Sequence, residues 1–115
     1  MNINYTGGFH TYYVYILTNK NKTVLYTGVT NNLKIRLEQH KSNMVLKPSS
    51  FTGKYNTFYL IYFKKFTWIQ EAIAQEKVIK GWTRQKKLDL IYTINPEMNF
   101  LNYLFEASKN NNDEE

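Results

Sequence analysis

The order of local sequence patterns predicts an α+β fold, a small three-stranded antiparallel sheet with helices packed on it. Two runs rich in aromatic and β-branched residues lie close together near the start of the chain. A third such run follows a segment that contains Pro and Gly, and the rest of the chain carries helix-capping and helix-ending residues. The expected order is therefore strand, strand, helix, strand, helix, helix.

The first two runs predict a β-hairpin. Residues 12–17 (YYVYIL) and 24–27 (VLYT) have the composition of strands, and the polar segment 18–23 (TNKNKT) joins them. We expect Gly28 to end the second strand, at the point where the chain must turn.

Alternation along these strands brings two tyrosines together. Tyr13, Tyr15 and Leu17 share one face of the first strand, and Tyr26 lies on one face of the second. If the register of the hairpin agrees, Tyr15 and Tyr26 lie near each other on one side of the sheet. On these facts alone, cross-strand aromatic packing is the favoured explanation of the pair.

The middle of the chain predicts a helix, a loop and a strand. Thr30 or Asn31 can cap a helix over residues 32–41. Residues 42–56 include Pro, Gly and two serines and are expected to form a loop. Residues 57–66 (TFYLIYFKKF) predict the third strand, and their apolar character suggests a central one.

Capping signals divide the remainder into helices. Thr67 with Gln70 forms a capping box, Gly81 follows the helix that the box begins, and Thr83 caps the next helix. Asn95 precedes a proline, which disfavours helical backbone angles. The predicted helices occupy residues 68–80, 84–94 and 99–107.

The 115 residues fit one domain, expected at residues 11–107. A flexible N-terminal arm is expected at 1–10 and a polar acidic tail at 108–115. The chain has no cysteine, which excludes disulfides, thiolate zinc sites and cysteine nucleophiles. Without a signal peptide or a long apolar run, a cytoplasmic protein with no membrane association is expected.

The charge distribution favours a polyanionic partner. The formal net charge is +6, although the last three residues are all acidic. Basic residues are concentrated at Lys77, Lys80, Arg84, Lys86 and Lys87. A nucleic acid would satisfy such a surface, and a solvated basic surface that aids solubility is the alternative.

Helical spacing places polar residues on faces that should be apolar. In the first predicted helix Leu33 and Leu37 define the inner stripe, and Arg36 and His40 fall on the same stripe, whereas Ile35 does not. A buried cation or imidazole needs partners, so this face is either a polar core or a site.

The helix predicted at 68–80 has the same irregularity. Ile69, Ala72, Ile73 and Ile79 mark its inner stripe, and the spacing turns Glu76 inward as well. A buried carboxylate costs several kcal/mol unless it is paired, hydrogen-bonded or bound to metal. A buried Arg36–Glu76 ion pair with His40 as its neighbour explains these residues as well as a functional site does.

Taken in order, these residues resemble the GIY-YIG nuclease family. Residues 13–15 (YVY) and 26–28 (YTG) are similar to its two triplets, and Arg36 and His40 are similar to its first helix. The segment 71–87 resembles the metal-binding helix of the small stand-alone bacterial branch, and residues 95–97 resemble the end of that branch. Related domains include the N-terminal nuclease module of the bacterial excision-repair nuclease, an enzyme of DNA repair.

The resemblance implies a role for each matching residue. Tyr26 would help to deprotonate the attacking water, and Tyr15 would orient that water or share the role of base. Arg36 would hold the scissile phosphate, and His40 would assist proton transfer or contact a phosphate. Glu76 would bind one Mg²⁺ or Mn²⁺.

Further positions are implied as contacts to nucleic acid. These residues are Lys80, Trp82, Arg84, Lys86, Lys87 and Asn95. The chain departs from the family pattern at Tyr13, which replaces Gly, and at Thr27, which replaces Ile. Val29 stands where the repair nucleases carry Lys, which removes one phosphate contact or proton acceptor.

The resemblance thus implies a metal-dependent endonuclease that hydrolyses DNA phosphodiester bonds in a structure- or sequence-dependent way. The alternative is a nucleic-acid-binding module of the same fold with little or no catalytic activity. The sequence leaves RNA open as a partner beside DNA. Because one small domain offers little surface for target choice, it also leaves open a protein partner or a homodimer.

Overall fold

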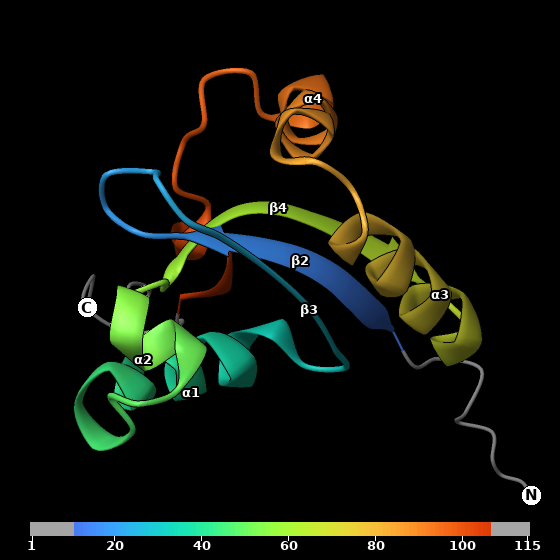
Figure 1. The fold of residues 1–115 in the computed structure, drawn as a ribbon. Helices are drawn as coiled ribbons and strands as arrows, with labels where there is room; N and C mark the ends of the chain where they lie inside the picture. The colour runs from blue at the N-terminus through green and yellow to red at the C-terminus, as the bar shows by residue number, and fades with distance from the viewer. Residues whose placement is uncertain (1–10, 107–115) are drawn as a thin grey trace, which may run out of the picture.

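The computed structural model describes residues 11–106 of the chain (Figure 1). The arm expected at 1–10 and the tail expected at 108–115 lie outside the described residues. The elements are β2 (Tyr12–Thr18), β3 (Leu25–Thr30), α1 (Leu33–Leu46), α2 (Phe51–Tyr55), β4 (Tyr59–Phe66), α3 (Ile69–Lys80), α4 (Arg84–Ile94) and the 3-10 helix η1 (Asn102–Phe105). The predicted α+β class with a three-stranded antiparallel sheet is confirmed.

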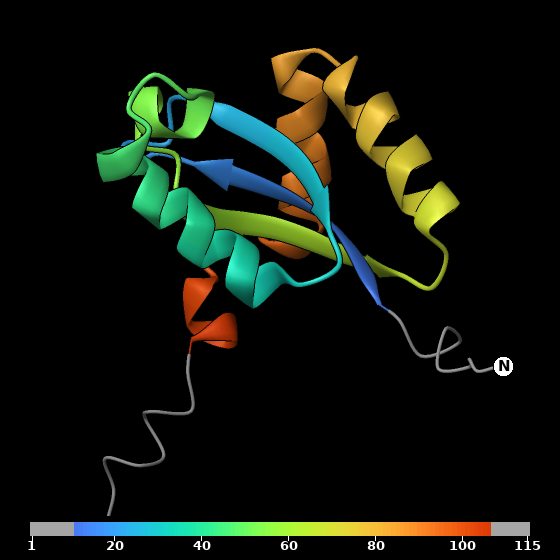
Figure 2. The same cartoon turned by 90° about the horizontal axis from the view of Figure 1, so that it is seen from below.

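The sheet has the order β3-β2-β4, so β2 is the central strand. The expectation that the third strand is central was wrong. Its apolar composition has another cause, because helices cover both faces of the sheet and bury residues on both sides of β4. Figures 1 and 2 show α1 and α2 on one side of the sheet, and α3 and α4 cover the other side.

Two apolar layers hold these elements together. On one face, residues of β2 and β4 pack against α3 and α4 through Ala72, Ile79 and Ile91. On the other face, Leu33 and Leu37 of α1 pack against the sheet. Burial of these side chains drives the fold, at about 1.5–3 kcal/mol for each large apolar group.

The first helix is longer than predicted, and the loop expected after it contains a further helix. α1 continues to Leu46, because no residue ends it before Lys47, which precedes a proline. Its N-cap is Asn32, whose side chain accepts from the Ile35 backbone N–H, rather than Thr30 or Asn31. α2 is capped by Ser50, whose hydroxyl accepts from Gly53 N–H.

Two other boundaries differ from the predictions. α3 starts after Trp68, which has extended backbone angles and no capping side chain, so the expected capping box at Thr67 does not form. The helix expected at 99–107 is reduced to η1, because the chain before it is hydrogen-bonded to β4, with Leu101 N–H donating to Leu60 O. The cap at Thr83 and the helix end at Gly81 are confirmed.

Within residues 11–106, no helix combines the length and the apolar character needed to cross a bilayer.

Candidate functional site

The Tyr15 side chain is buried and lies over Gly28 of the neighbouring strand. Tyr15 pairs with Gly28 in the register of β2 with β3. A Cβ atom on Gly28 would lie 2.5 Å from both Cζ and the hydroxyl oxygen of Tyr15. Gly28 therefore lies within β3 and leaves room for the tyrosine ring, and the expectation that it ends the strand was wrong.

The hydroxyl of Tyr15 connects two residues of α1. Arg36 Nε donates to this oxygen at 3.3 Å, and His40 Nε2 lies 2.8 Å from it. The hydroxyl can accept from Arg36 and still donate its own proton, and His40 Nε2 is the acceptor within hydrogen-bond distance of it. His40 then carries its proton on Nδ1, which is buried without a hydrogen-bond partner in the described part of the chain.

Burial fixes the protonation states of this pair at neutral pH. Burial raises the pKa of Tyr15 to about 12, although the hydrogen bond from Arg36 opposes the shift. Burial, together with the charge of Arg36, lowers the pKa of His40 to about 4. Tyr15 is therefore a protonated donor and His40 a neutral acceptor.

Arg36 lies at the edge of the buried layer, half-exposed. Burial alone would lower its pKa, but its interactions with the hydroxyls of Tyr15 and Tyr26 outweigh that effect and raise it. Its Nη1 group donates to Gln39 Oε1 at 2.8 Å. The guanidinium is thus held in place by neutral groups and keeps its full positive charge.

Tyr26 lies beside this group, as the alternation of the strands predicts. Its ring centre is 6.4 Å from that of Tyr15 and 5.4 Å from that of His40. Unlike Tyr15, it is only half-buried. The structure therefore brings Tyr15, Tyr26, Arg36 and His40 together, in an arrangement made by β2, β3 and α1.

Glu76 lies on α3 with 9% of its surface exposed. Its Oε2 atom forms an ion pair with Lys80 Nζ, one helical turn further on, at 2.5 Å. The carboxylate is near enough to Tyr15 for its charge to raise the pKa of that hydroxyl, as the last of several causes. The alternative of an Arg36–Glu76 ion pair is not what forms, since Arg36 bonds to Tyr15 and Gln39 and Glu76 pairs with Lys80.

The inner stripe predicted for α3 is only partly right. Ala72, Glu76 and Ile79 are buried, whereas Ile69 and Ile73 are exposed. These two isoleucines line a shallow groove with Val29 and other residues at the edge of β3.

The residues expected to contact nucleic acid differ in how far they are exposed. Lys80 and Lys86 are exposed, and Lys86 Nζ lies 4.7 Å from the ring centre of Trp82. Trp82 and Lys87 are half-buried, and Trp82 packs against the core. Arg84 is exposed, but it donates to the backbone carbonyls of the β2–β3 loop at 3.1 and 3.2 Å.

Asn95 has a structural role. It is buried, and its amide donates to Ile61 O at 2.8 Å and to Asn99 O at 2.9 Å, while its carbonyl accepts from Asn99 N–H. The expected phosphate contact at this position has no donor left to make it. Asn95 instead fixes the turn that follows α4.

The loop prediction for residues 42–56 missed two exposed aromatic residues. Phe51 and Tyr55 lie on α2, and the Phe51 ring centre is 5.6 Å from that of Tyr26. The capping residue Ser50 is the signal in the sequence that could have revealed this helix.

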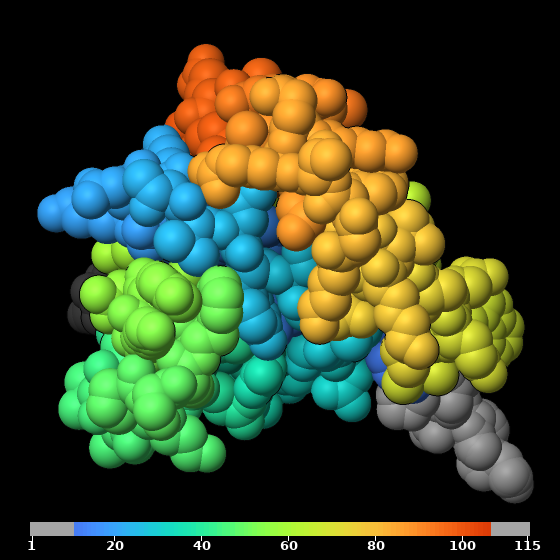
Figure 3. All heavy atoms as spheres, viewed as in Figure 1, coloured from blue at the N-terminus to red at the C-terminus, as the bar shows by residue number. Residues whose placement is uncertain are grey.

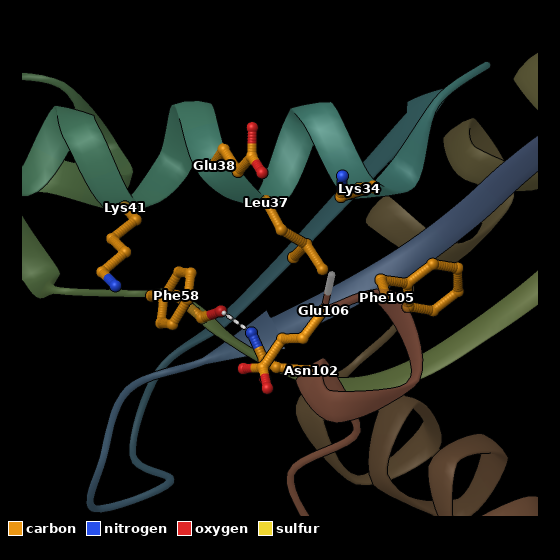
Figure 4. Close-up of a pocket in the computed structure, with 8 residues that line it drawn as sticks. All are labelled: Lys34, Leu37, Glu38, Lys41, Phe58, Asn102, Phe105 and Glu106. Atoms are coloured by element: carbon orange, nitrogen blue, oxygen red, sulfur yellow. Dashed lines mark hydrogen bonds between the residues drawn. The ribbon is translucent and has the colours of Figure 1, made fainter. Parts of the chain in front are cut away.

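A separate hollow of about 230 Å³ lies between α1 and η1 (Figure 4). Lys34, Leu37, Glu38 and Lys41 line its α1 side, and the side chain of Asn102 donates to Phe58 O at 3.0 Å across it. This hydrogen bond ties η1 to the start of β4. None of the predicted catalytic residues lines the hollow.

No group of three or more His, Cys, Asp or Glu residues that could hold a metal ion occurs within residues 11–106. Glu76 is the carboxylate that the resemblance implies as the metal ligand. Mg²⁺ is commonly bound in this way, through one or two carboxylates with water and substrate phosphate oxygens as its other ligands.

A comparison of sequences identifies the class of this domain. The family profile described as GIY-YIG catalytic domain matches residues 11–89, and the chain therefore belongs to the GIY-YIG family. This family indicates a nuclease-type function with a nucleic acid as the substrate, and its nucleases generally use divalent metal ions.

Within the family, the chain is similar to small bacterial proteins called UPF0213. It is 41% identical over 80 residues to UPF0213 protein OB0043 of Oceanobacillus iheyensis, covering 70% of this chain and 88% of that protein. It is 42% identical over 79 residues to UPF0213 protein CPE1444 of Clostridium perfringens, covering 69% and 81%. The solution structure of UPF0213 protein BH0048 from Bacillus halodurans has a TM-score of 0.49 and 30% identity, covering 76% of this chain and 88% of that one.

Proposed function

We propose that this chain is an endonuclease that hydrolyses phosphodiester bonds of DNA with one divalent metal ion. The observation that carries the proposal is the Tyr15 hydroxyl, which holds Arg36 on one side and His40 on the other, beside the half-exposed Tyr26. A purely structural aromatic pair would need neither the arginine nor the histidine.

Arg36 binds the scissile phosphate in this proposal. A guanidinium has five N–H donors, and the hydrogen bonds to Tyr15 and Gln39 use two of them. The remaining donors suit the planar, bidentate recognition of a phosphate. Because Arg36 is already oriented, it stabilises the extra negative charge of the transition state without reorganising.

The two tyrosines have different roles. A Tyr15 hydroxyl with a pKa of about 12 stays protonated, so it positions Arg36 and does not act as the base. His40 is buried and acts through Tyr15, as the acceptor of its proton. Tyr26 is the hydroxyl left to contact the attacking water, because it is half-exposed at the same point.

Glu76 is the residue that would hold Mg²⁺ or Mn²⁺. A carboxylate oxygen is the ligand that these ions prefer. In the structure this carboxylate already has a positively charged partner, the ammonium group of Lys80. When bound, the ion supplies charge neutralisation at the phosphate and a lower pKa for a coordinated water. Lys80 would move from the carboxylate and become free to contact a phosphate.

The test is nicking of supercoiled plasmid and cleavage of branched DNA by the purified chain in Mg²⁺ or Mn²⁺. Glu76→Ala and Tyr26→Phe should each abolish most of the activity. Glu71→Ala is the matched control, because Glu71 is exposed in the first turn of the same helix. Equal nicking by the wild type and Glu76→Ala would mean a contaminating nuclease and would overturn the proposal.

A second candidate is a nucleic-acid-binding module with little or no cutting. The Glu76–Lys80 ion pair and Val29, at the position of a lysine in the repair nucleases, favour it. Binding that persists in EDTA and weakens steeply with salt, with no cleavage of any DNA or RNA tested, would support this candidate.

Size-exclusion chromatography with light scattering, alone and with DNA, would reveal a homodimer that adds surface for target choice.

A further inference from the structure

A row of aromatic rings leads out of the candidate site onto the surface. Phe51 follows Tyr26 at 5.6 Å between ring centres, and Tyr55 follows Phe51 at 4.9 Å. Lys54 Nζ lies 5.3 Å from the ring centre of Tyr55. We call Phe51 and Tyr55, with this lysine, the aromatic ladder.

The ladder is exposed because α2 is anchored by its opposite side. Phe51 is 45% exposed and Tyr55 40% exposed, whereas Thr52 and Gly53 are buried. A Cβ on Gly53 would overlap a backbone oxygen of the residue after α1, so the glycine allows the two helices to meet closely. This tight contact fixes the helix and leaves both rings facing solvent.

The ladder is continuous with the candidate site. Tyr26 contacts Phe51 on one side and the rings of Tyr15 and His40 on the other. In Figure 3, α2 lies at the rim of the surface where β3 is visible between α2 and α3. A strand with its phosphate at Arg36 that continues over Tyr26 would reach Phe51.

Exposed aromatic rings with an adjacent lysine are the chemistry that binds unpaired nucleotides. Nucleobases stack on aromatic rings whatever their identity, and a nearby cation contacts the backbone. Bases inside a duplex are stacked on each other and do not offer their faces to such rings. A half-exposed phenylalanine that contacts Tyr26, a member of the same group as the arginine proposed to bind phosphate, thus fits a nucleotide that has left the helix.

We infer that the aromatic ladder binds an unpaired nucleotide next to the scissile phosphate, so that the preferred substrate is single-stranded or locally unpaired nucleic acid. This inference rests on the proposed function, since it takes Arg36 as the phosphate site. It names the substrate class that the proposal leaves open.

The test measures binding and not cutting. Fluorescence anisotropy in EDTA compares a labelled twelve-nucleotide thymidine strand, the matching uridine strand and a twelve-base-pair duplex. Phe51→Leu keeps an apolar side chain but removes the ring, and should weaken binding of the single strands by roughly five- to tenfold. Duplex affinity should change less than about twofold.

Three variants control the experiment. Phe51→Trp should retain single-strand binding, because it keeps an aromatic face. Tyr103→Leu should have no effect, since Tyr103 is 64% exposed on η1 and is outside the ladder. If Phe51→Leu loses cooperative thermal unfolding, Tyr55→Leu takes its place in the same comparison.

A second readout reports stacking directly. A single strand with 2-aminopurine at its centre should lose emission on binding the wild type and keep it with Phe51→Leu. Unchanged single-strand affinity in Phe51→Leu and Tyr55→Leu would overturn the inference, as would equal losses on single strand and duplex. A change in oligomeric state with unchanged affinity would assign the ladder to a contact between copies of the chain and would also overturn it.

The outcomes separate this inference from the proposed function. Metal-dependent nicking that needs Glu76, together with single-strand binding that does not depend on Phe51, would support the proposed nuclease and refute the role of the aromatic ladder. Single-strand binding that needs Phe51, with no nicking under any condition, would support the role of the aromatic ladder and refute the proposed nuclease.

Discussion

Replacing Gly28 by alanine tests whether the room that this residue leaves for Tyr15 holds the site together. The new Cβ would lie 2.5 Å from Cζ and the hydroxyl oxygen of Tyr15 and 3.0 Å from its Cε2. Real Cβ atoms do not approach other heavy atoms so closely, and the ring has to move. Tyr15 is 1% exposed and its ring lies against those of Tyr26 and His40, which limit its movement.

The magnitude follows from this geometry. Forcing extra volume into a packed interior costs about 1–3 kcal/mol. The shift of the ring also loosens the 2.8 Å contact with His40 and the 3.3 Å hydrogen bond from Arg36. We expect Gly28→Ala to lower the free energy of unfolding by about 2–4 kcal/mol, the sum of overpacking and about one hydrogen bond.

Urea denaturation followed by circular dichroism measures this change, with Gly81→Ala as the control. A Cβ on Gly81 would lie 3.6 Å from its nearest neighbour, which is ordinary contact, so that variant should be neutral or slightly stabilising. In a Tyr15→Leu background, Gly28→Ala should cost at least about 1 kcal/mol less than in the wild type, because the atoms it meets are gone. Equal stabilities of Gly28→Ala and Gly81→Ala, or additive effects in the double variant, would refute the reasoning.

Three further predictions concern pH, the core and charge. In the unfolded chain His40 binds a proton below its ordinary pKa of 6.5, but the folded protein holds that pKa at about 4. The unfolded state therefore binds more protons between these values, so stability is full above about pH 6.5 and falls by up to about 3 kcal/mol as the pH decreases towards 4. Urea midpoints across this range should show the fall in the wild type and a flatter profile in His40→Asn. Asn95→Ala should lower the free energy of unfolding by about 1–3 kcal/mol and leave nucleic-acid affinity unchanged in anisotropy, with the exposed Asn99→Ala as control. Charge reversal at Lys86 and Lys87 should weaken the binding of every sequence alike. The slope of log affinity against log salt concentration should become less steep by roughly one for each phosphate that these lysines neutralise in the wild type. An unchanged slope would contradict their role.

Predictions that depended on local signals were the most accurate. Thr83 caps α4 through its side chain, and this helix has the predicted bounds, because a cap and a following Asn-Pro need only their neighbours in sequence. The burial of Leu33, Leu37 and His40 and the exposure of Ile35 also follow from helical spacing alone.

Predictions that depended on distant contacts failed for a common reason. The exposure of Ile69 and Ile73 was missed, since the sheet beneath α3 covers only part of its apolar stripe. The predicted position of the third strand within the sheet was also wrong. The apolar composition of a strand indicates that helices cover both of its faces, but it does not indicate how many strands pair with it. The hydrogen bond of Asn95 to Ile61, 34 residues away on β4, was beyond any local pattern.

The sequence by itself determined the fold class, the paired tyrosines and the inward positions of Arg36, His40 and Glu76, because alternation and helical period are properties of the backbone. Only the tertiary structure decided how these groups are used. The packing of α1 on the sheet brings Tyr15 within hydrogen-bond distance of Arg36 and His40. Glu76 forms its ion pair with Lys80 and not with Arg36. Such choices depend on which partner lies within hydrogen-bond distance, and that is fixed only when separate elements pack together.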